Sequence, residues 1–255
     1  MEIKSFYCLI LLGLWICGNG QVSLVVKEVP LNSNKSYIPD NEEALNIETH
    51  YPGRLLELII SNGSDRSISL PLDTASYAVP FTENIREYYK KNDDILPVPD
   101  LYNILGVTAF VYQKGKFITA DMGSMPFYEE MQWQEINKIE KLRLSKIHQW
   151  MADKNISDEL SATYNWYLIN HMVTIPAHKS ITYKVYFNPF LKKLEKYSSS
   201  LYYVNLDSKL SYEVVLKLIL PKNLYKFLTK EDRRKYPDLF TGIVSSNRLV
   251  FKAAN

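Results

Sequence analysis

The sequence predicts a mainly β protein: an antiparallel β-sandwich with one long helical insertion at about residues 129–153. Three observations predict this fold class. Apolar and polar residues alternate in several short segments, turn-forming residues separate those segments, and one long stretch without Gly or Pro has the composition of a helix. Because strand patterns rarely alternate with helical ones, a sandwich is favoured over a parallel α/β sheet.

The alternation is clearest in Leu210–Leu220, where six consecutive even positions are large and apolar. Ile181–Phe187 has the same period of two. Successive side chains of a strand point to opposite faces, so each pattern predicts one buried and one wetter face. Further strands are predicted at Val22–Glu28, Leu55–Ile60, Ile68–Leu72, Val107–Tyr112, Leu168–Ile175 and Arg248–Phe251.

Three turns between these segments predict hairpins. Ser61–Asp65 contains Asn and Gly, which tolerate the positive φ of tight turns. Lys114-Gly115 separates Val107–Tyr112 from the short apolar run that follows it. Pro176–Lys179 connects the last two predicted strands before residue 190. Each turn is expected to join two antiparallel strands that pair with each other.

The helical insertion is rich in Glu, Lys, Leu, Gln and Met, which favour helices. At 100° per residue one side collects Trp133, Ile136, Leu144, Ile147, Trp150 and Met151. Glu140 and Arg143 interrupt that side. We interpret the segment as a helix that covers the core of the sandwich, with a partner-binding helix as the alternative. Shorter helices are predicted at Thr82–Lys91 and Thr229–Lys235, where Thr229 and Asp232 form a start signal.

The first 20 residues have the layout of a secretory signal peptide. Lys4 precedes an apolar run, Phe6–Cys17, and Gly18-Asn19-Gly20 supplies small residues before Gln21. The run is shorter than the roughly 20 residues that span a membrane. The chain is therefore expected to consist of a signal peptide, residues 1–20, and one β-sandwich domain with its helical insertion, residues 21–255.

Both cysteines, Cys8 and Cys17, lie in the predicted leader, so the mature chain is expected to have no disulfide. The predicted location is extracytoplasmic, either periplasmic or secreted. A lipid anchor on Cys17 is the minor alternative, because Trp15-Ile16 replace the small residue that lipoprotein processing needs before the cysteine.

Charge and composition exclude several classes of protein. A net charge of +2 is too balanced for a nucleic-acid binder. A hydrophobic content of 46% excludes a disordered chain. After the leader, no segment is long and apolar enough to form a transmembrane helix. No nucleic-acid partner is expected.

Two segments resemble strand–turn–strand units of immunoglobulin-like accessory domains in exported bacterial proteins. They are LELIISNGSDRSISLPLD (Leu56–Asp73) and VTIPAHKSITYKVYFNP (Val173–Pro189), and together they cover about 35 residues. The Gly-Asn-Gly-Gln cleavage site is also similar to those of secreted Bacteroidetes proteins. The resemblance implies an immunoglobulin-like sandwich and an export route. It assigns a role to no residue, because fold alone does not imply function.

No catalytic, metal or cofactor site is predicted from sequence motifs. The histidines His50, His148, His171 and His178 lack metal-ligand spacing, and only His171 and His178 are expected to approach each other, across a hairpin. Gly123-Ser124 lacks the flanking glycines of a nucleophile elbow and is interpreted as a turn. No cofactor is expected, and any ligand-binding residues are unknown.

Aromatic and charged clusters are the remaining candidates. Tyr88-Tyr89, Tyr164/Trp166/Tyr167 and Tyr202-Tyr203 are interpreted as strand residues at the edge of the core, with sugar or protein recognition as the alternative. Asp232-Arg233-Arg234-Lys235 mixes signs and is interpreted as a solvated helix end. Asn34, Asn62 and Asn155 begin glycosylation sequons.

Taken together, these patterns favour an exported non-catalytic binding or structural protein over an enzyme, with a protein or carbohydrate as its partner. The alternative is an extracytoplasmic hydrolase whose site is assembled from residues distant in sequence. A deep pocket with converging histidines or carboxylates would favour the hydrolase.

The first prediction concerns processing. Because the apolar run ends in small residues before Gln21, we expect the exported protein to begin at Gln21. Mass spectrometry of the N-terminal peptide measures this directly. An intact Met1, or a lipid on Cys17, would show that the leader is not cleaved as expected.

Overall fold

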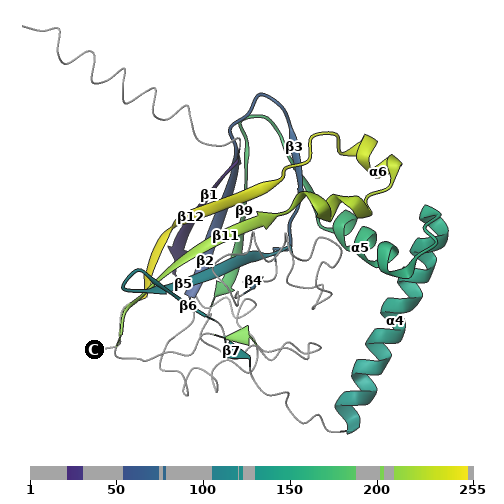
Figure 1. The fold of residues 1–255 in the computed structure, drawn as a ribbon, viewed down its shortest axis with the longest axis horizontal. Coiled ribbons are helices and arrows are strands. Elements are labelled where there is room, and N and C mark those ends of the chain that lie inside the picture. Colours follow the sequence, from purple (N-terminus) through teal and green to yellow (C-terminus); the bar gives the residue numbers. More distant parts are fainter. Residues whose placement is uncertain are drawn as a thin grey trace, which may run out of the picture.

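The computed structural model describes residues 22–30, 54–74, 77–78, 105–119, 121–122, 130–187, 202–203 and 210–251. The protein is mainly β, as predicted, and its sheets are almost entirely antiparallel. The strands lie on one side of the molecule and the helices gather at one end of them (Figure 1).

Two sheets form the body of the protein. In the first, β2 (Arg54–Asn62) lies between β1 (Val22–Val29) and β9 (Ser180–Phe187). The second sheet has the order β12-β11-β5-β4. Its strands are β12 (Gly242–Phe251), β11 (Tyr212–Leu220), β5 (Val107–Gln113) and β4 (Tyr77–Ala78), and β6 (Lys116–Ile118) also pairs with β5.

Two short ribbons complete the described strands. One pairs β3 (Ile68–Pro71) with β8 (Met172–Ile175). The other pairs β7 (Asp121–Met122) with β10 (Tyr202–Tyr203). All four residues of β3 are buried, so this strand is covered on both faces.

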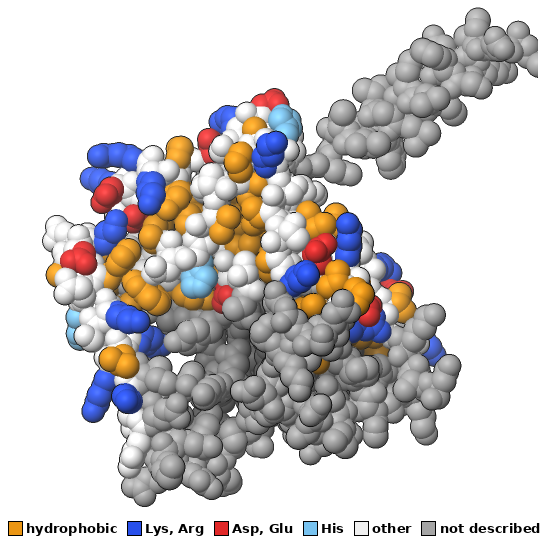
Figure 2. Space-filling view, turned by 180° about the vertical axis from the view of Figure 1, so that it is seen from behind, with side chains coloured by type: hydrophobic (Ala, Val, Ile, Leu, Met, Phe, Trp, Pro, Cys, Tyr) orange, Lys and Arg blue, Asp and Glu red, His pale blue; other side chains and the backbone are white. Residues whose placement is uncertain are grey.

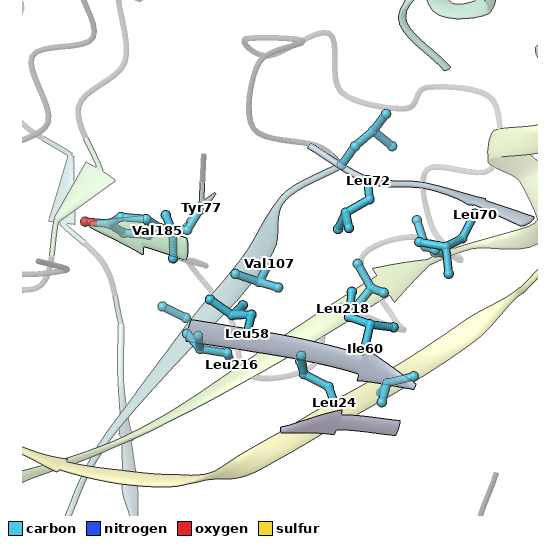
Figure 3. Close-up of a cluster of buried hydrophobic side chains, with 14 of the residues drawn as sticks. Leu24, Leu58, Ile60, Leu70, Leu72, Tyr77, Val107, Val185, Leu216 and Leu218 are labelled. Atoms are coloured by element: carbon cyan, nitrogen blue, oxygen red, sulfur yellow. The ribbon is translucent and has the colours of Figure 1, made fainter. Parts of the chain in front are cut away.

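The core lies between the two main sheets and contains side chains from both. Leu24, Leu58 and Ile60 of the first sheet lie near Val107, Leu216 and Leu218 of the second (Figure 3). Central strand β11 follows the predicted alternation: five of its even positions are buried, while Glu213, Val215 and Lys217 are half-buried. The prediction for Leu210–Leu220 is confirmed apart from its first two residues, which precede the strand.

The predicted hairpin at Lys114-Gly115 is confirmed. β5 and β6 pair through Val111 with Ile118 and Gln113 with Lys116. Lys114 and Gly115 have φ values of 49° and 78°, so both turn residues adopt the left-handed conformation of a tight hairpin turn.

The other two predicted hairpins are wrong. β2 pairs with β9, and β3 pairs with β8, so neither Ser61–Asp65 nor Pro176–Lys179 joins strands that pair with each other. Both turns are corners: at Ser61–Asp65 the chain passes from the first sheet into the β3–β8 ribbon, and at Pro176–Lys179 it returns from the ribbon to the first sheet. Turn residues indicate a change of direction, but they do not determine which strands become partners.

Asn62 holds the two corners together. Its backbone N–H donates to the Lys179 carbonyl at 2.9 Å. Its side-chain nitrogen donates to the carbonyls of Arg66, Ile175 and Pro176 at 2.7, 3.0 and 3.1 Å, and its side-chain oxygen accepts from Ser64. The Asn62 side chain thereby satisfies carbonyls that no strand pairs at these corners.

Asn247 joins the edges of the two sheets. The pairing of β11 with β12 shifts between Val215 and Lys217, so Ser246 and Asn247 lie in a bulge. The Asn247 side-chain oxygen accepts from the Val26 N–H at 2.8 Å, and its nitrogen donates to the Val26 carbonyl at 3.0 Å. One side-chain amide thus replaces a backbone partner for edge strand β1.

The long helix is confirmed as α4 (Glu130–Lys154). Its main packing partner is a second helix, α5 (Glu159–Asn170), rather than a sheet. Ile147 is fully buried there, and Trp150 and Met151 are partly buried. No helix among the described residues is long and apolar enough to span a membrane.

Helix α5 corrects the prediction of a strand at Leu168–Ile175. The strand there is only β8, and Leu168 belongs to the helix that precedes it. Asp158 caps α5 by accepting from the Ser161 N–H at 2.7 Å. The apolar residues of this segment suggested one continuous strand, but its first residues complete the capped helix α5 and only Met172–Ile175 form β8.

The predicted helix start at Thr229 is confirmed. Thr229 and Asp232 form a reciprocal capping box for α6 (Lys230–Lys235), which follows the 3₁₀ helix η2 (Lys222–Phe227). The predicted leader with Cys8 and Cys17, the predicted helix at Thr82–Lys91, and the Tyr88-Tyr89 pair lie outside the described residues.

The alternating pattern of β11 gives the second prediction. Leu216 is fully buried, so Leu216→Asp should lower the free energy of unfolding by on the order of 4 kcal/mol or more. Lys217→Asp should cost about 1–2 kcal/mol, because Lys217 is half-buried and its amine lies 3.9 Å from the Phe110 ring centroid. Thermal and denaturant melts compare the two variants. Equal losses would contradict the assigned faces of this strand.

Candidate functional site

The described histidines lie apart, and each has its own partner. The His171 ring nitrogen Nδ1 is 2.8 Å from the Tyr167 carbonyl, at the end of α5. His178 lies 2.9 Å from Asp65 in an exposed turn, and His148 lies 3.1 Å from Glu159. The expected approach of His171 to His178 depended on a hairpin that does not form. His50 lies outside the described residues.

A metal site is not assembled in the described part of the chain: no three His, Cys, Asp or Glu side chains gather there in a way that could hold an ion. Ser124, the nearest residue to a serine motif, is outside the described residues. Of the sequon residues, Asn62 is buried at the two corners, Asn155 is exposed after α4, and Asn34 is not described.

A buried carboxylate, Asp73, lies between two tyrosines. The Tyr167 hydroxyl donates to it at 3.1 Å, and the buried Tyr183 hydroxyl has no hydrogen-bond partner among the described residues. Burial, and then the negative charge of Asp73, raise the pKa of Tyr183 far above its ordinary value. Tyr183 therefore stays protonated at physiological pH. The cluster links α5 to the residues that follow β3.

The aromatic cluster Tyr164/Trp166/Tyr167 also serves packing. It lies on α5 rather than on the expected strand. Tyr164 is 2% exposed, and its ring stacks on Phe227 at a centroid distance of 4.3 Å. Trp166 is half-buried against the core. The predicted core role of the two tyrosines is thus confirmed, whereas their expected position on alternate faces of a strand is wrong.

The Asp232 carboxylate, which is only 2% exposed in α6, has several hydrogen-bond partners from different helices. It accepts from the Thr229 N–H at 3.0 Å, the Thr229 hydroxyl at 2.7 Å and the Asn165 side-chain nitrogen at 2.8 Å. The Lys154 ammonium group lies 3.3 Å away. One carboxylate therefore connects the end of α4, the middle of α5 and the start of α6.

Asn165 extends this network. It is fully buried, and its side-chain oxygen accepts from the Trp150 indole at 2.8 Å. Its side-chain nitrogen also donates to the Phe227 carbonyl at 2.9 Å. Every polar atom of the Asn165 amide thus has a partner, as a buried amide requires.

The pKa values of the charged pair move in opposite directions. Burial alone would raise the pKa of Asp232, but hydrogen bonds from Thr229, Asn165 and Lys154 outweigh it and lower the pKa. Burial alone would lower the pKa of Lys154, but Asp232 and then Glu231 outweigh it and raise the pKa. Both groups are therefore charged at neutral pH, and they neutralise each other inside the protein.

The burial of Asp232 changes the charge of the surface above it. Between Lys222 and Lys235 the only exposed carboxylate is Glu231, and its oxygen lies 3.6 Å from Lys154. Six cations of the same segment are exposed. We call these six residues the basic corner: Lys222, Lys226, Lys230, Arg233, Arg234 and Lys235.

Few local groups neutralise the basic corner. Arg233 donates to the backbone carbonyls of Leu228 and Tyr225 at 3.2 and 2.8 Å, which fixes its guanidinium group. Within the described part of the chain, Lys222, Lys230, Arg234 and Lys235 have no carboxylate within ion-pair distance. The corner is therefore a local concentration of positive charge.

A cavity of about 470 Å³ lies along α4. Its described lining is Gln134, Asn137, Lys138, Lys141 and Leu142, which share one face of the helix. Among these lining residues are two further cations and no carboxylate or histidine. Blue side chains gather along the side of the molecule that carries α4 and α6, at the left of Figure 2.

Sequence reasoning missed the basic corner because Asp232 precedes its three last cations and suggests a mixed-sign helix end. The signal that could have revealed it is the capping box. A carboxylate that caps its own helix is withdrawn from the surface, so it no longer balances its neighbours.

The sequence matches no known protein family, and no curated protein matches it.

The third prediction tests the buried carboxylate. Asp232→Ala should lower the free energy of unfolding by about 3–5 kcal/mol, because it removes the cap of α6, the nearer carboxylate of the Lys154 charge and one acceptor of the buried Asn165 amide. Glu231→Ala is the matched control, since that side chain is 81% exposed and also faces Lys154. It should cost less than about 0.5 kcal/mol. Similar losses in both variants would contradict the structural role of Asp232.

The difference in stability between the wild type and the Asp232→Ala variant should also depend on pH. A lowered carboxylate pKa stabilises the folded state above the pKa of the unfolded chain, at about pH 4, and this contribution is lost as the pH falls through the folded pKa. The stability difference between wild type and Asp232→Ala should therefore be constant at neutral pH and shrink below about pH 4.

Proposed function

We propose that the protein is exported and acts as a non-catalytic binding protein, in which an immunoglobulin-like β-sandwich presents the basic corner to a polyanionic partner. The sandwich assignment is supported by two antiparallel sheets that share one core, with central strands β2 and β11. It is also supported by the β3–β8 ribbon, to which strands of the first sheet lead through two corners.

Export is supported by the leader-like sequence before Gln21. The first strand adds to this, because β1 begins at Val22 and its Val22, Leu24 and Val26 are buried. Cleavage before Gln21 would leave every residue of that strand in the mature chain. The proposed location is extracytoplasmic.

A single observation carries the binding function: the carboxylate that would balance the η2–α6 segment lies inside the protein, and six cations remain outside. The segment from Lys222 to Lys235 contains six basic and two acidic residues, while the whole chain has a net charge of +2. This segment is therefore more positive than the chain as a whole. Such a patch attracts anions at long range and holds them by salt-sensitive contacts.

The fourth prediction tests this localisation. A corner variant with Lys222→Gln, Lys230→Gln, Arg234→Gln and Lys235→Gln should elute from a sulfated resin at markedly lower salt than the wild type. The matched control neutralises four exposed lysines on the strands and turns, Lys27, Lys116, Lys179 and Lys184, and so has the same net charge.

The control should elute close to the wild type, because its lysines lie on strands and turns of the sheets rather than on the η2–α6 segment. Equal shifts of the two variants would mean that the resin responds to net charge alone, and the proposed binding surface would be wrong. All eight substituted side chains are exposed, so thermal melts of both variants should match the wild type within about 0.5 kcal/mol per site.

A further inference from the structure

The basic corner projects from the body of the protein. η2 and α6 connect the end of β11 to the start of β12, and they extend beyond the sheets at the upper right of Figure 1. Both helices are short, with six residues each. The cations of the basic corner therefore lie on a part of the molecule that extends beyond the sheets (Figure 1), where a large anionic surface can approach them.

Four of the six cations of the basic corner are lysines, and the other two are Arg233 and Arg234. Arg233 donates from Nε to the Leu228 carbonyl and from a terminal nitrogen to the Tyr225 carbonyl, so two of its three guanidinium nitrogens are already engaged. The lysines that remain carry compact charges on long stems, which recognise charge density rather than the shape of one anion. This favours a partner that displays many negative charges in a plane.

Two aromatic rings lie beside these charges. The Lys226 amine is 5.2 Å from the Phe227 ring centroid, and the Lys235 amine is 5.2 Å from the Tyr236 ring centroid. Both rings are half-buried at the foot of the corner. The Phe227 ring stacks on Tyr164, whereas the Tyr236 ring is amphipathic. A lysine stem beside such a ring suits the boundary between lipid head groups and water.

We propose that the partner of the basic corner is the anionic head-group surface of a lipid membrane, to which the protein binds peripherally. This inference rests on the proposed function, because it identifies the polyanion that the corner binds. Each cation is attracted weakly to the negatively charged head groups. The total binding free energy therefore grows with the number of cations and weakens as the salt concentration rises.

Vesicle co-sedimentation is the fifth prediction and tests the inference with a defined probe. The mature chain should sediment with vesicles of phosphatidylglycerol and phosphatidylcholine, and should remain in solution with phosphatidylcholine alone. The four-residue corner variant should partition on the order of a hundredfold more weakly, since each cation near an anionic surface contributes separately. The control variant with Lys27, Lys116, Lys179 and Lys184 neutralised should bind within severalfold of the wild type.

A salt series provides a second measurement that needs no variant. Binding to the anionic vesicles should disappear at about 1 M ionic strength, where the Debye length is about 3 Å. Retention on the sulfated resin without binding to anionic vesicles would overturn the lipid inference and leave the proposed function intact, with a polysaccharide or an acidic protein as the polyanion. Equal binding to both kinds of vesicle, or equal loss in both variants, would also overturn it.

Discussion

The carboxylate of Asp232 lies inside the protein, and the helical end of the molecule is arranged around it. Three helices and a 3₁₀ turn contribute a partner or a neighbour: Lys154 from α4, Asn165 from α5, Thr229 before α6, and the Phe227 carbonyl through Asn165. Removing a charge from water is expensive, so an arrangement of this kind persists only where every hydrogen-bonding position is filled. Here Asp232, which caps α6, also contacts Lys154 of α4 and Asn165 of α5 and so holds the three helices together.

The same physical solution recurs in the β part of the structure. At the two corners, Asn62 hydrogen-bonds carbonyls of three other residues. At the sheet edges, Asn247 takes the place of a neighbouring strand for Val26. In each case a short polar side chain supplies hydrogen bonds at a point where regular pairing stops. The fold thus depends on apolar contacts for its core and on a few such residues for its corners.

The sequence predicted those parts of the fold whose patterns are local. β11, α4 and the capping box at Thr229 all follow from residues within one element, and all are present. Pairing is not local. Whether the turns at residues 61–65 and 176–179 close a hairpin depends on which strands lie beside them, and the sequence of a turn does not contain that information. The strand predicted at Leu168–Ile175 failed for a related reason: a short apolar run can belong to a strand or to the end of a buried helix, and its periodicity does not separate the two.

The candidate site also combines features that the local sequence predicts with features that depend on the tertiary structure. Every cation of the basic corner is visible in the sequence, but its net charge is not, because that depends on where the Asp232 side chain lies. Asp232 and Lys154 neutralise each other in the interior, and Glu231 also faces Lys154. The exposed cations of η2 and α6 then repel one another, and nothing in the packing of these short helices requires Lys222, Lys230 or Arg234 to be basic. Features that folding does not need, and that cost some stability, are those most simply explained by binding.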